Sequence, residues 1–397
     1  MEFAAIILIA VLQAAPADRA HAEQLARAGR NAEAIALFER VVEANPADVE
    51  ARLWVAILSL RLGRTADAEA LFRSVLRDHP ANVDARIGLA NVLTRTGGWT
   101  EALDLLIATE QDAGQNADLF AALARAYRRS GDDDKALEYF RRARALSPDD
   151  ADVALGFENV ARTYGHWIGF ELFRQTDQFD NVVQAYTLLG SIRATRRTHV
   201  EVSARTQQGP SYSDAIAGGG VVLRVGRATT AAMHVSGGAN NAALATLDFS
   251  AEAMHYHGMF EIGGSVRRMI FNTSNLTALS PQFAWDREPW RVDARYTVSR
   301  STFDPVARSN LDHSVVIRPT WQAWRRLALQ GAFAYGIESF DELTVDRLFT
   351  LDKTTLGAAV RIDAPSLTRL TLAWEHQGRS NNRPVDRFTF TVIQAIP

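Results

Sequence analysis

The sequence contains few residue patterns that could support catalysis. It has no Gly-x-x-x-x-Gly-Lys phosphate-binding loop, no Gly-x-Ser-x-Gly nucleophile motif and no His-Glu-x-x-His metal motif. It also has no cysteine, which excludes disulfides, thiolate metal ligands and thiol nucleophiles. We therefore predict that the protein is not an enzyme and that it binds no cofactor and no metal.

Two groups of residues resemble metal ligands only weakly. His255 and His257 would share one face of a strand, but no carboxylate stands beside them, so an aromatic band is the simpler interpretation. Asp341, Glu342 and Asp346 stand close together between turn residues, where a solvated acidic cluster is the more common outcome. Neither group changes the prediction.

The most informative charged residues are arginines that alternate with apolar residues. From Trp290 to Ser299 every second residue is apolar, and the residues between them are charged or carry hydroxyl groups. Because successive side chains of a β-strand point to opposite faces, this stretch would have one apolar face and one polar face. The same alternation recurs around Val202, Ala358 and Phe390. A sheet with two chemically different faces is therefore predicted for residues 164–397.

Alternating segments of about ten residues, separated by turns, are typical of an antiparallel transmembrane β-barrel. We predict 12 to 14 such strands in residues 164–397, with apolar faces toward lipid and polar faces lining a lumen. Tryptophans near segment ends, such as Trp290 and Trp324, are typical of the aromatic girdles at membrane surfaces. A soluble β-sandwich alternates in the same way and is the alternative.

The predicted lumen face carries more arginine than acid on several strands. The candidate lumen residues are Arg205, Arg224, Arg267, Arg291, Asp293, Arg295, Arg361 and Arg369. One hypothesis is a path for an anionic solute or polysaccharide. The other is a barrel whose interior is filled by an arginine–acid network.

Residues 18–163 contain a 34-residue repeat. Glycine recurs at this spacing at Gly29, Gly63, Gly97 and Gly131, with alanine five residues after and seven residues before each one. Phenylalanine or leucine follows nine residues after each glycine, and proline or glycine seventeen after. The pattern resembles the tetratricopeptide repeat (TPR), whose antiparallel helix pairs cross at small residues and stack into an α-solenoid. The resemblance implies four repeats and a capping helix at residues 151–163.

The TPR resemblance also implies a partner. Such stacks bind segments of other chains along a concave face that is lined by the first helix of each repeat. In this sequence that face would carry Arg61, Asn91, Arg95, Arg125, Arg128 and Arg129. These residues would suit an acidic or C-terminal peptide or an anionic polymer. A solvated helix face is the alternative interpretation.

The first 17 residues have the features of a signal peptide. Residues Phe3 to Ala15, which are apolar apart from Gln13, lead into the small-x-small cleavage pattern Ala15-Pro16-Ala17, although Glu2 stands where a basic residue is usual. Residues 1–159 carry 18 basic and 25 acidic side chains, and residues 160–397 carry 25 and 21. This asymmetry indicates two units, but it is too small for a nucleic-acid partner.

A signal peptide, a short repeat array and a C-terminal barrel in this order resemble the YaiO-type outer-membrane β-barrel family and, less closely, exopolysaccharide export porins. One departure is that Phe390, not the last residue, is the final aromatic. The resemblance implies a bacterial outer-membrane location, contact with membrane lipid, a periplasmic TPR domain that docks a protein or peptide, and a role in exporting or binding an anionic exopolysaccharide. A soluble TPR adaptor with a β-sandwich, and a barrel-embedded enzyme acting on lipid or glycan, are the alternatives.

Overall fold

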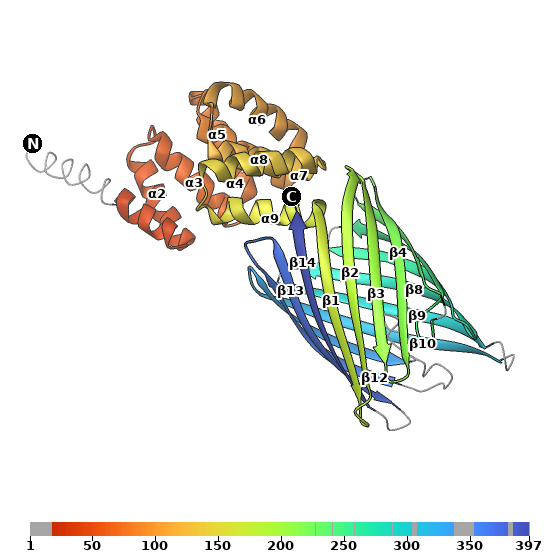
Figure 1. Cartoon of the computed structure of the whole chain (residues 1–397). Helices are drawn as coiled ribbons and strands as arrows, with labels where there is room; N and C mark the ends of the chain where they lie inside the picture. The colour runs from red at the N-terminus through yellow and green to blue at the C-terminus, as the bar shows by residue number, and fades with distance from the viewer. Residues whose placement is uncertain are drawn as a thin grey trace, which may run out of the picture. The chain divides into compact units, whose positions relative to one another are not determined.

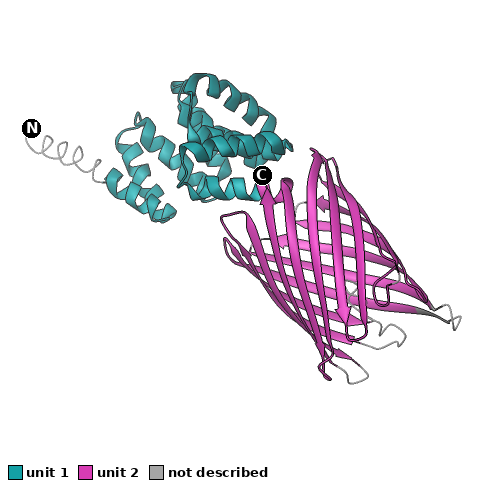
Figure 2. Cartoon of the chain, in the orientation of Figure 1, with its two compact units in different colours: residues 1–160 teal, residues 161–397 magenta. Residues whose placement is uncertain are grey.

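The computed structural model describes residues 18–226, 228–239, 241–257, 259–287, 289–303, 308–336, 353–379 and 384–396. It divides into two compact units, residues 1–160 and 161–397 (Figure 2). The predicted signal peptide at residues 1–17 and the acidic cluster at residues 341–346 lie outside the described residues. No helix in the described ranges is both long enough and apolar enough to cross a membrane.

Unit 1 is a series of antiparallel helix pairs. A first helix covers residues 18–27. It is followed by α2 (Asn31–Ala44), α3 (Val49–Arg61), α4 (Thr65–Asp78), α5 (Val83–Thr96), α6 (Trp99–Ala113), α7 (Ala117–Ser130), α8 (Asp133–Leu146) and α9 (Ala151–Tyr164). The predicted 34-residue helical repeat is confirmed.

Periodic capping and turn residues set the helix boundaries. The repeat glycines Gly29, Gly63, Gly97 and Gly131 all adopt a left-handed backbone with φ between 76° and 95°, which only glycine adopts without strain. The side chains of Asp48, Asn82 and Asn116 each accept a hydrogen bond from the backbone N–H three residues later, at the start of α3, α5 and α7. Because these residues also recur every 34 positions, each first helix begins in the same way.

The core of the stack comes from the residues that define the repeat. Phe38, Phe72, Leu106 and Phe140 are buried between helices, as are the alanines on either side of each turn glycine. Gly88 on α5 packs directly against the ring of Phe72, where a Cβ atom would lie 2.2 Å from the nearest ring carbon. Complementary large and small side chains therefore bind each repeat to the next.

Unit 2 is a closed antiparallel barrel of 14 strands (Figure 1). The strands are β1 (His166–Asp177), β2 (Val182–Thr195), β3 (Thr198–Gly209), β4 (Tyr212–Val225), β5 (Thr229–Gly237), β6 (Leu247–His257), β7 (Phe260–Ile270), β8 (Ser274–Arg287), β9 (Trp290–Phe303), β10 (Arg308–Trp324), β11 (Leu327–Gly336), β12 (Lys353–Asp363), β13 (Thr368–Arg379) and β14 (Val385–Ile396). Each strand pairs with its sequence neighbour, and β14 pairs with β1 to close the ring. The prediction of 12 to 14 antiparallel strands is confirmed, and the β-sandwich alternative is wrong.

The two faces of the strands differ as the alternation predicts. Large apolar side chains cover the outside of the barrel, where Leu188, Ile262 and Leu372 are 62%, 60% and 59% exposed. The alternate positions point into the lumen and carry the arginines and acids. A buried apolar interior, which holds a soluble sandwich together, is therefore replaced in this unit by a polar one.

The two rims of the barrel have different connections. One rim holds the start of β1, the end of β14 and the short connections 196–197, 226–228, 258–259, 288–289, 325–326 and 364–367. The opposite rim holds connections 178–181, 210–211, 238–246, 271–273, 304–307, 337–352 and 380–384. We call these the short-turn rim and the loop rim.

Candidate functional site

The predicted partner-binding residues lie on the first helices of successive repeats. Asn91 and Arg95 belong to α5, and Arg125 belongs to α7. Arg125 Nη2 donates a hydrogen bond to Asn91 Oδ1 at 3.3 Å, and Arg95 Nη1 donates to the carbonyl oxygen of Leu60 at 2.8 Å. These contacts join α3, α5 and α7 along one exposed strip. The remaining predicted residues, Arg61, Arg128 and Arg129, are exposed in the last turns of α3 and α7.

The strip also has an acidic edge that sequence reasoning missed. Its members follow the same 34-residue period in the first turns of α3, α5, α7 and α9; they are Glu50, Asp84, Asp118 and Asp152. An acid and the arginine eleven residues later lie on one helix face, because eleven residues make about three turns. The pairs Asp84–Arg95 and Asp118–Arg129 satisfy this spacing. The strip is therefore acidic where these helices begin and basic where they end, as the helix dipole favours.

A polar–aromatic cluster holds the last complete repeat together. The ring of Tyr139 on α8 stacks on Tyr127 of α7 with centroids 5.5 Å apart, and its hydroxyl donates to Glu110 Oε2 of α6 at 2.9 Å. Burial, together with this hydrogen bond, raises the pKa of Tyr139 to about 12. The cluster joins three helices and keeps α7, which carries Arg125, in position.

In the lumen, the predicted residue Arg291 has three carboxylate partners. Its Nη1 lies 2.6 Å from Glu261 and 3.3 Å from Asp286, and its Nη2 lies 2.7 Å from Asp293. Glu261, Asp286 and the Arg291–Asp293 pair come from β7, β8 and β9, so the network crosses neighbouring strands. Of the predicted set, the structure thus brings Arg291 and Asp293 into contact.

Two further predicted arginines form ion pairs. Arg267 Nη2 lies 2.6 Å from Asp248, and Arg369 Nε lies 2.7 Å from Asp363. Arg361 is 3.8 Å from the same Asp363 and donates to Gln322 at 3.2 Å. Arg361 and Arg369 thus share one carboxylate.

The remaining predicted arginines have other surroundings. Arg205 donates to Gln207 at 3.0 Å, and within unit 2 the guanidinium carbon of Arg224 lies 4.1 Å from the ring centroid of Tyr164. Arg295 points inward from the middle of β9 and forms no hydrogen bond or ion pair with any described residue.

Small residues on the inner wall let neighbouring side chains lie flat. The His234 ring lies over Gly220, so a Cβ atom on Gly220 would be 2.2 Å from this ring. The ring extends toward Glu201, and His234 Nδ1 is 3.7 Å from Glu201 Oε2. On the other side of the lumen, a Cβ atom on Gly357 would lie 2.9 Å from the side chain of Glu375. Side chains that cross a glycine in this way lie close to the wall of the barrel. The Glu201–His234 pair was not predicted from the sequence.

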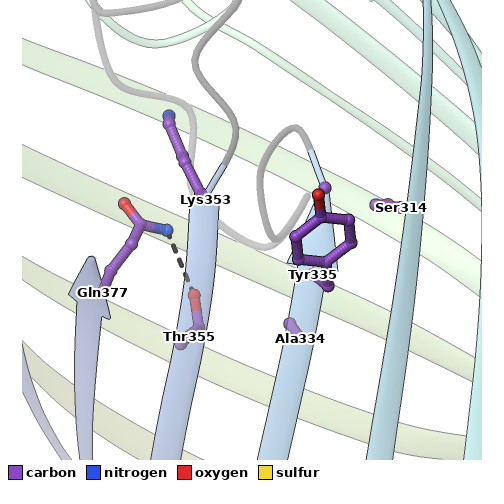
Figure 3. Close-up of a pocket in the computed structure, with 7 residues that line it drawn as sticks. Ser314, Ala334, Tyr335, Lys353, Thr355 and Gln377 are labelled. Carbon is purple, nitrogen blue, oxygen red and sulfur yellow. Dashed lines mark hydrogen bonds between the residues drawn. The ribbon is translucent and has the colours of Figure 1, made fainter. Parts of the chain in front are cut away.

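A shallow pocket lies in the inner wall near the loop rim (Figure 3). Its lining residues come from β10 to β13 and include Ser314, Lys353, Thr355 and Gln377. Gln377 Nε2 donates to Thr355 Oγ1 at 3.3 Å, and Ser314 Oγ is buried without a hydrogen-bond partner. The pocket encloses no space large enough for a water molecule, so it gives no sign of a bound ligand.

Nothing in the described ranges gathers three His, Asp or Glu side chains into a set that could hold a metal. His255 and His257 lie on the outer face of β6, and His255 Nδ1 lies 2.9 Å from the hydroxyl of Thr229. The absence of a cofactor and of catalysis stays a prediction.

A stack of 34-residue helix pairs followed by a closed barrel defines the class of this chain: a TPR domain joined to a 14-stranded antiparallel β-barrel domain. Three family models described as tetratricopeptide repeat match residues 19–83, 59–126 and 117–157. The N-terminal region is therefore a TPR domain. No curated protein is significantly similar to the chain.

Several solved structures are similar to the chain over about its TPR region. TTC0263, a TPR protein of Thermus thermophilus, is 25% identical, with 38% of this chain and 82% of that chain covered and a TM-score of 0.36. MamA from Desulfovibrio magneticus is 23% identical, with coverage of 37% and 82% and a TM-score of 0.31. PilF of Pseudomonas aeruginosa is 18% identical, with coverage of 39% and 70% and a TM-score of 0.33.

Proposed function

We propose that this chain is an outer-membrane β-barrel protein that docks a periplasmic protein through its TPR domain and assists the export or binding of an exopolysaccharide. The observation that carries the proposal is the outer surface of the barrel. Every strand carries exposed apolar side chains on this surface, and together they cover a much larger area than the apolar patches of soluble proteins. A closed barrel satisfies all its backbone hydrogen bonds internally, so this surface suits hydrocarbon.

The two rims of the barrel support one orientation of the chain in the outer membrane. Outer-membrane barrels have short periplasmic turns and longer extracellular loops. The chain enters the barrel at His166 and leaves it at Ile396, and both residues lie at the short-turn rim. Because only Gly165 separates α9 from β1, the TPR domain joins the barrel at that rim. We therefore assign the TPR domain to the periplasm.

The charged strip of the TPR domain supports docking of a protein partner. Asp84 and Asp118 lie near one edge of the strip, Arg95 and Arg129 near the other, and Arg125 between them. A partner segment that crosses the helices with basic groups toward the acidic edge and acidic groups toward the arginines would match both rows.

The lumen supports passage or binding of a polymer rather than a filled interior. Glycine and alanine occur at inward positions in the middle of several strands, and charged pairs such as Arg291–Glu261 stand toward a rim. The unpaired Arg295 adds a cation that an acidic sugar would contact. These features, with the YaiO-like layout, favour an exopolysaccharide over the alternative of an enzyme acting on lipid or glycan.

Heat-modifiable gel migration tests the membrane proposal. Folded barrel in detergent should migrate differently from the boiled sample. Absence of any shift in detergents and in phospholipid vesicles would refute the proposal.

The orientation is testable because the chain lacks cysteine. In intact cells an impermeant maleimide should label Ser211→Cys at the loop rim, and it should label Asp104→Cys on α6 only after the outer membrane is permeabilised. Both residues are exposed, so they are matched reporters. The reverse pattern would contradict the orientation.

Single-channel recording tests the open lumen. The purified protein should give conductance steps in a planar bilayer, and Arg295→Glu should shift the reversal potential toward cation selectivity. A bilayer that stays silent although the same sample is heat-modifiable would support the filled interior instead.

A further inference from the structure

Two arginines and a threonine lie side by side on the outer face of the barrel, close to the loop rim. Arg268 on β7 pairs in register with Thr277 on β8, and Thr277 pairs with Arg300 on β9. Neighbouring strands lie about 4.8 Å apart, so the two arginine Cα atoms are separated by about 10 Å. Arg268 Nη1 donates to Thr277 Oγ1 at 2.7 Å, which confirms that both side chains share the outer face. We call these three residues the arginine triplet.

Among the described residues, no acid lies beside the arginine triplet. Arg268 and Arg300 are exposed, and Arg300 forms no hydrogen bond or ion pair with any described residue. The other outward positions of β7, β8 and β9 carry no aspartate or glutamate within the described ranges. Two positive charges therefore face outward with their hydrogen-bond donors available.

The surface directly below the triplet is apolar. Val266, Leu279 and Val298 form the next outward row, again in register across the three strands. Val266 is 46% exposed and Leu279 is 57% exposed. The triplet thus marks the boundary where the outward face changes from apolar to cationic.

We propose that the arginine triplet binds the phosphate of an anionic membrane lipid, whose acyl chains lie on the Val266–Leu279–Val298 row. This inference rests on the proposed membrane location of the barrel. Arginine guanidinium groups match phosphate oxygens in geometry and charge, and the Thr277 hydroxyl adds a donor between them. A soluble protein or nucleic acid would not explain the exposed apolar row that continues the site toward the middle of the barrel. By the orientation proposed above, the lipid belongs to the outer leaflet.

The effect of the triplet can be estimated from the number of its charges. A basic residue near an anionic membrane surface contributes enough to change affinity about 5-fold, so two contribute about 30-fold. Folded protein in detergent should therefore bind dioleoylphosphatidylglycerol about 30-fold more tightly than zwitterionic dioleoylphosphatidylcholine. Native mass spectrometry, which counts lipid molecules bound to the intact protein, measures this ratio.

The double variant Arg268→Gln/Arg300→Gln should bind both lipids equally, and Arg300→Gln alone should keep a preference of about 5-fold. The matched control is Arg174→Gln on β1, an outward arginine near the same rim without a second arginine beside it. This control should keep nearly the full preference.

Three results would overturn the proposal. The first is that the double variant keeps the full preference for phosphatidylglycerol. The second is that Arg174→Gln loses this preference as completely as the double variant does. The third is that excess inorganic phosphate displaces phosphatidylglycerol, which would mean that the lipid chains are not recognised. Heat-modifiable migration of the same samples separates the two proposals: a shifted band without lipid preference rejects only the triplet, and absence of any shift rejects the membrane barrel itself.

Discussion

Replacing Leu372 by arginine tests what surrounds the barrel. Leu372 lies in the outward run of β13 between Leu370 and Trp374, and it is 59% exposed. If this surface faces hydrocarbon, arginine near the bilayer midplane should lower the free energy of unfolding by about 2–4 kcal/mol. Loss of the exposed part of the leucine from lipid should add about 1 kcal/mol. In water the same exposed substitution should change stability by less than about 0.5 kcal/mol.

The neighbouring residue Ala373 provides the matched control. It points into the lumen, where an arginine side chain can reach water and the other polar residues of the wall. Ala373→Arg should therefore lower the free energy of unfolding by less than about 1 kcal/mol. The two variants carry the same new side chain at adjacent positions, so their difference isolates the environment of each face.

The measurement is denaturant unfolding in phospholipid vesicles, with the folded fraction read from unboiled gel migration and refolding used to establish reversibility. A cost for Leu372→Arg that exceeds the cost for Ala373→Arg by several kcal/mol is the expected result. Equal small costs for both variants would mean that Leu372 faces water, and the membrane assignment would then fail.

Three more predictions follow from single contacts. Arg291→Gln should lower the free energy of unfolding by about 2–3 kcal/mol in the same vesicles, because it leaves nearby carboxylates without their arginine partner. Arg295→Gln, the control, should lower it by less than about 0.5 kcal/mol. Equal losses in the two variants would contradict the lumen network. Gly88→Ala should lower the free energy of unfolding of the helices, followed by circular dichroism during heating, by about 1–3 kcal/mol, because the new Cβ would lie 2.2 Å from the Phe72 ring. Adding Phe72→Leu should restore part of the loss. A Gly88→Ala variant as stable as wild type would refute this packing. The pKa of Tyr139 is raised from an ordinary 10.0 to about 12, which favours the neutral phenol in the folded state. The contribution of Tyr139 to stability is therefore complete below pH 10 and is lost as the pH rises through 12. The difference in tyrosinate absorbance between wild type and Tyr139→Phe should rise near pH 12, and a rise at the ordinary value would contradict the buried hydrogen bond.

The lumen and the TPR strip illustrate how charge is used differently in the two units. In the lumen, Arg291 meets Glu261, whose side chain is 13% exposed, so this pair is held largely away from water. On the TPR strip, Arg95 and Arg129 are exposed and lie at helix ends, where salt screens them strongly. We therefore expect partner docking to weaken as ionic strength rises, whereas the lumen pairs should persist.

The sequence by itself determined the local structure of both units. The 34-residue spacing of Gly29, Gly63, Gly97 and Gly131 determined the helix pairs, because turn residues and small crossing residues act within one repeat. The alternation from Trp290 to Ser299 determined which side chains share a face, because the direction of a strand side chain depends only on its place in the strand. The eight candidate lumen residues could be selected on these grounds, whereas the six candidate TPR residues also required the resemblance to the tetratricopeptide repeat.

Only the tertiary structure decided which residues meet. The pairing of β1 with β14, which joins His166 to Ile396, closes the ring at 14 strands, and no local pattern contains that number. The same holds for Arg291, whose partner Glu261 lies two strands away, and for the in-register row of Arg268 and Arg300. The physical reason is that a strand's faces follow from its own sequence, whereas register and closure depend on hydrogen bonds between segments far apart in the chain.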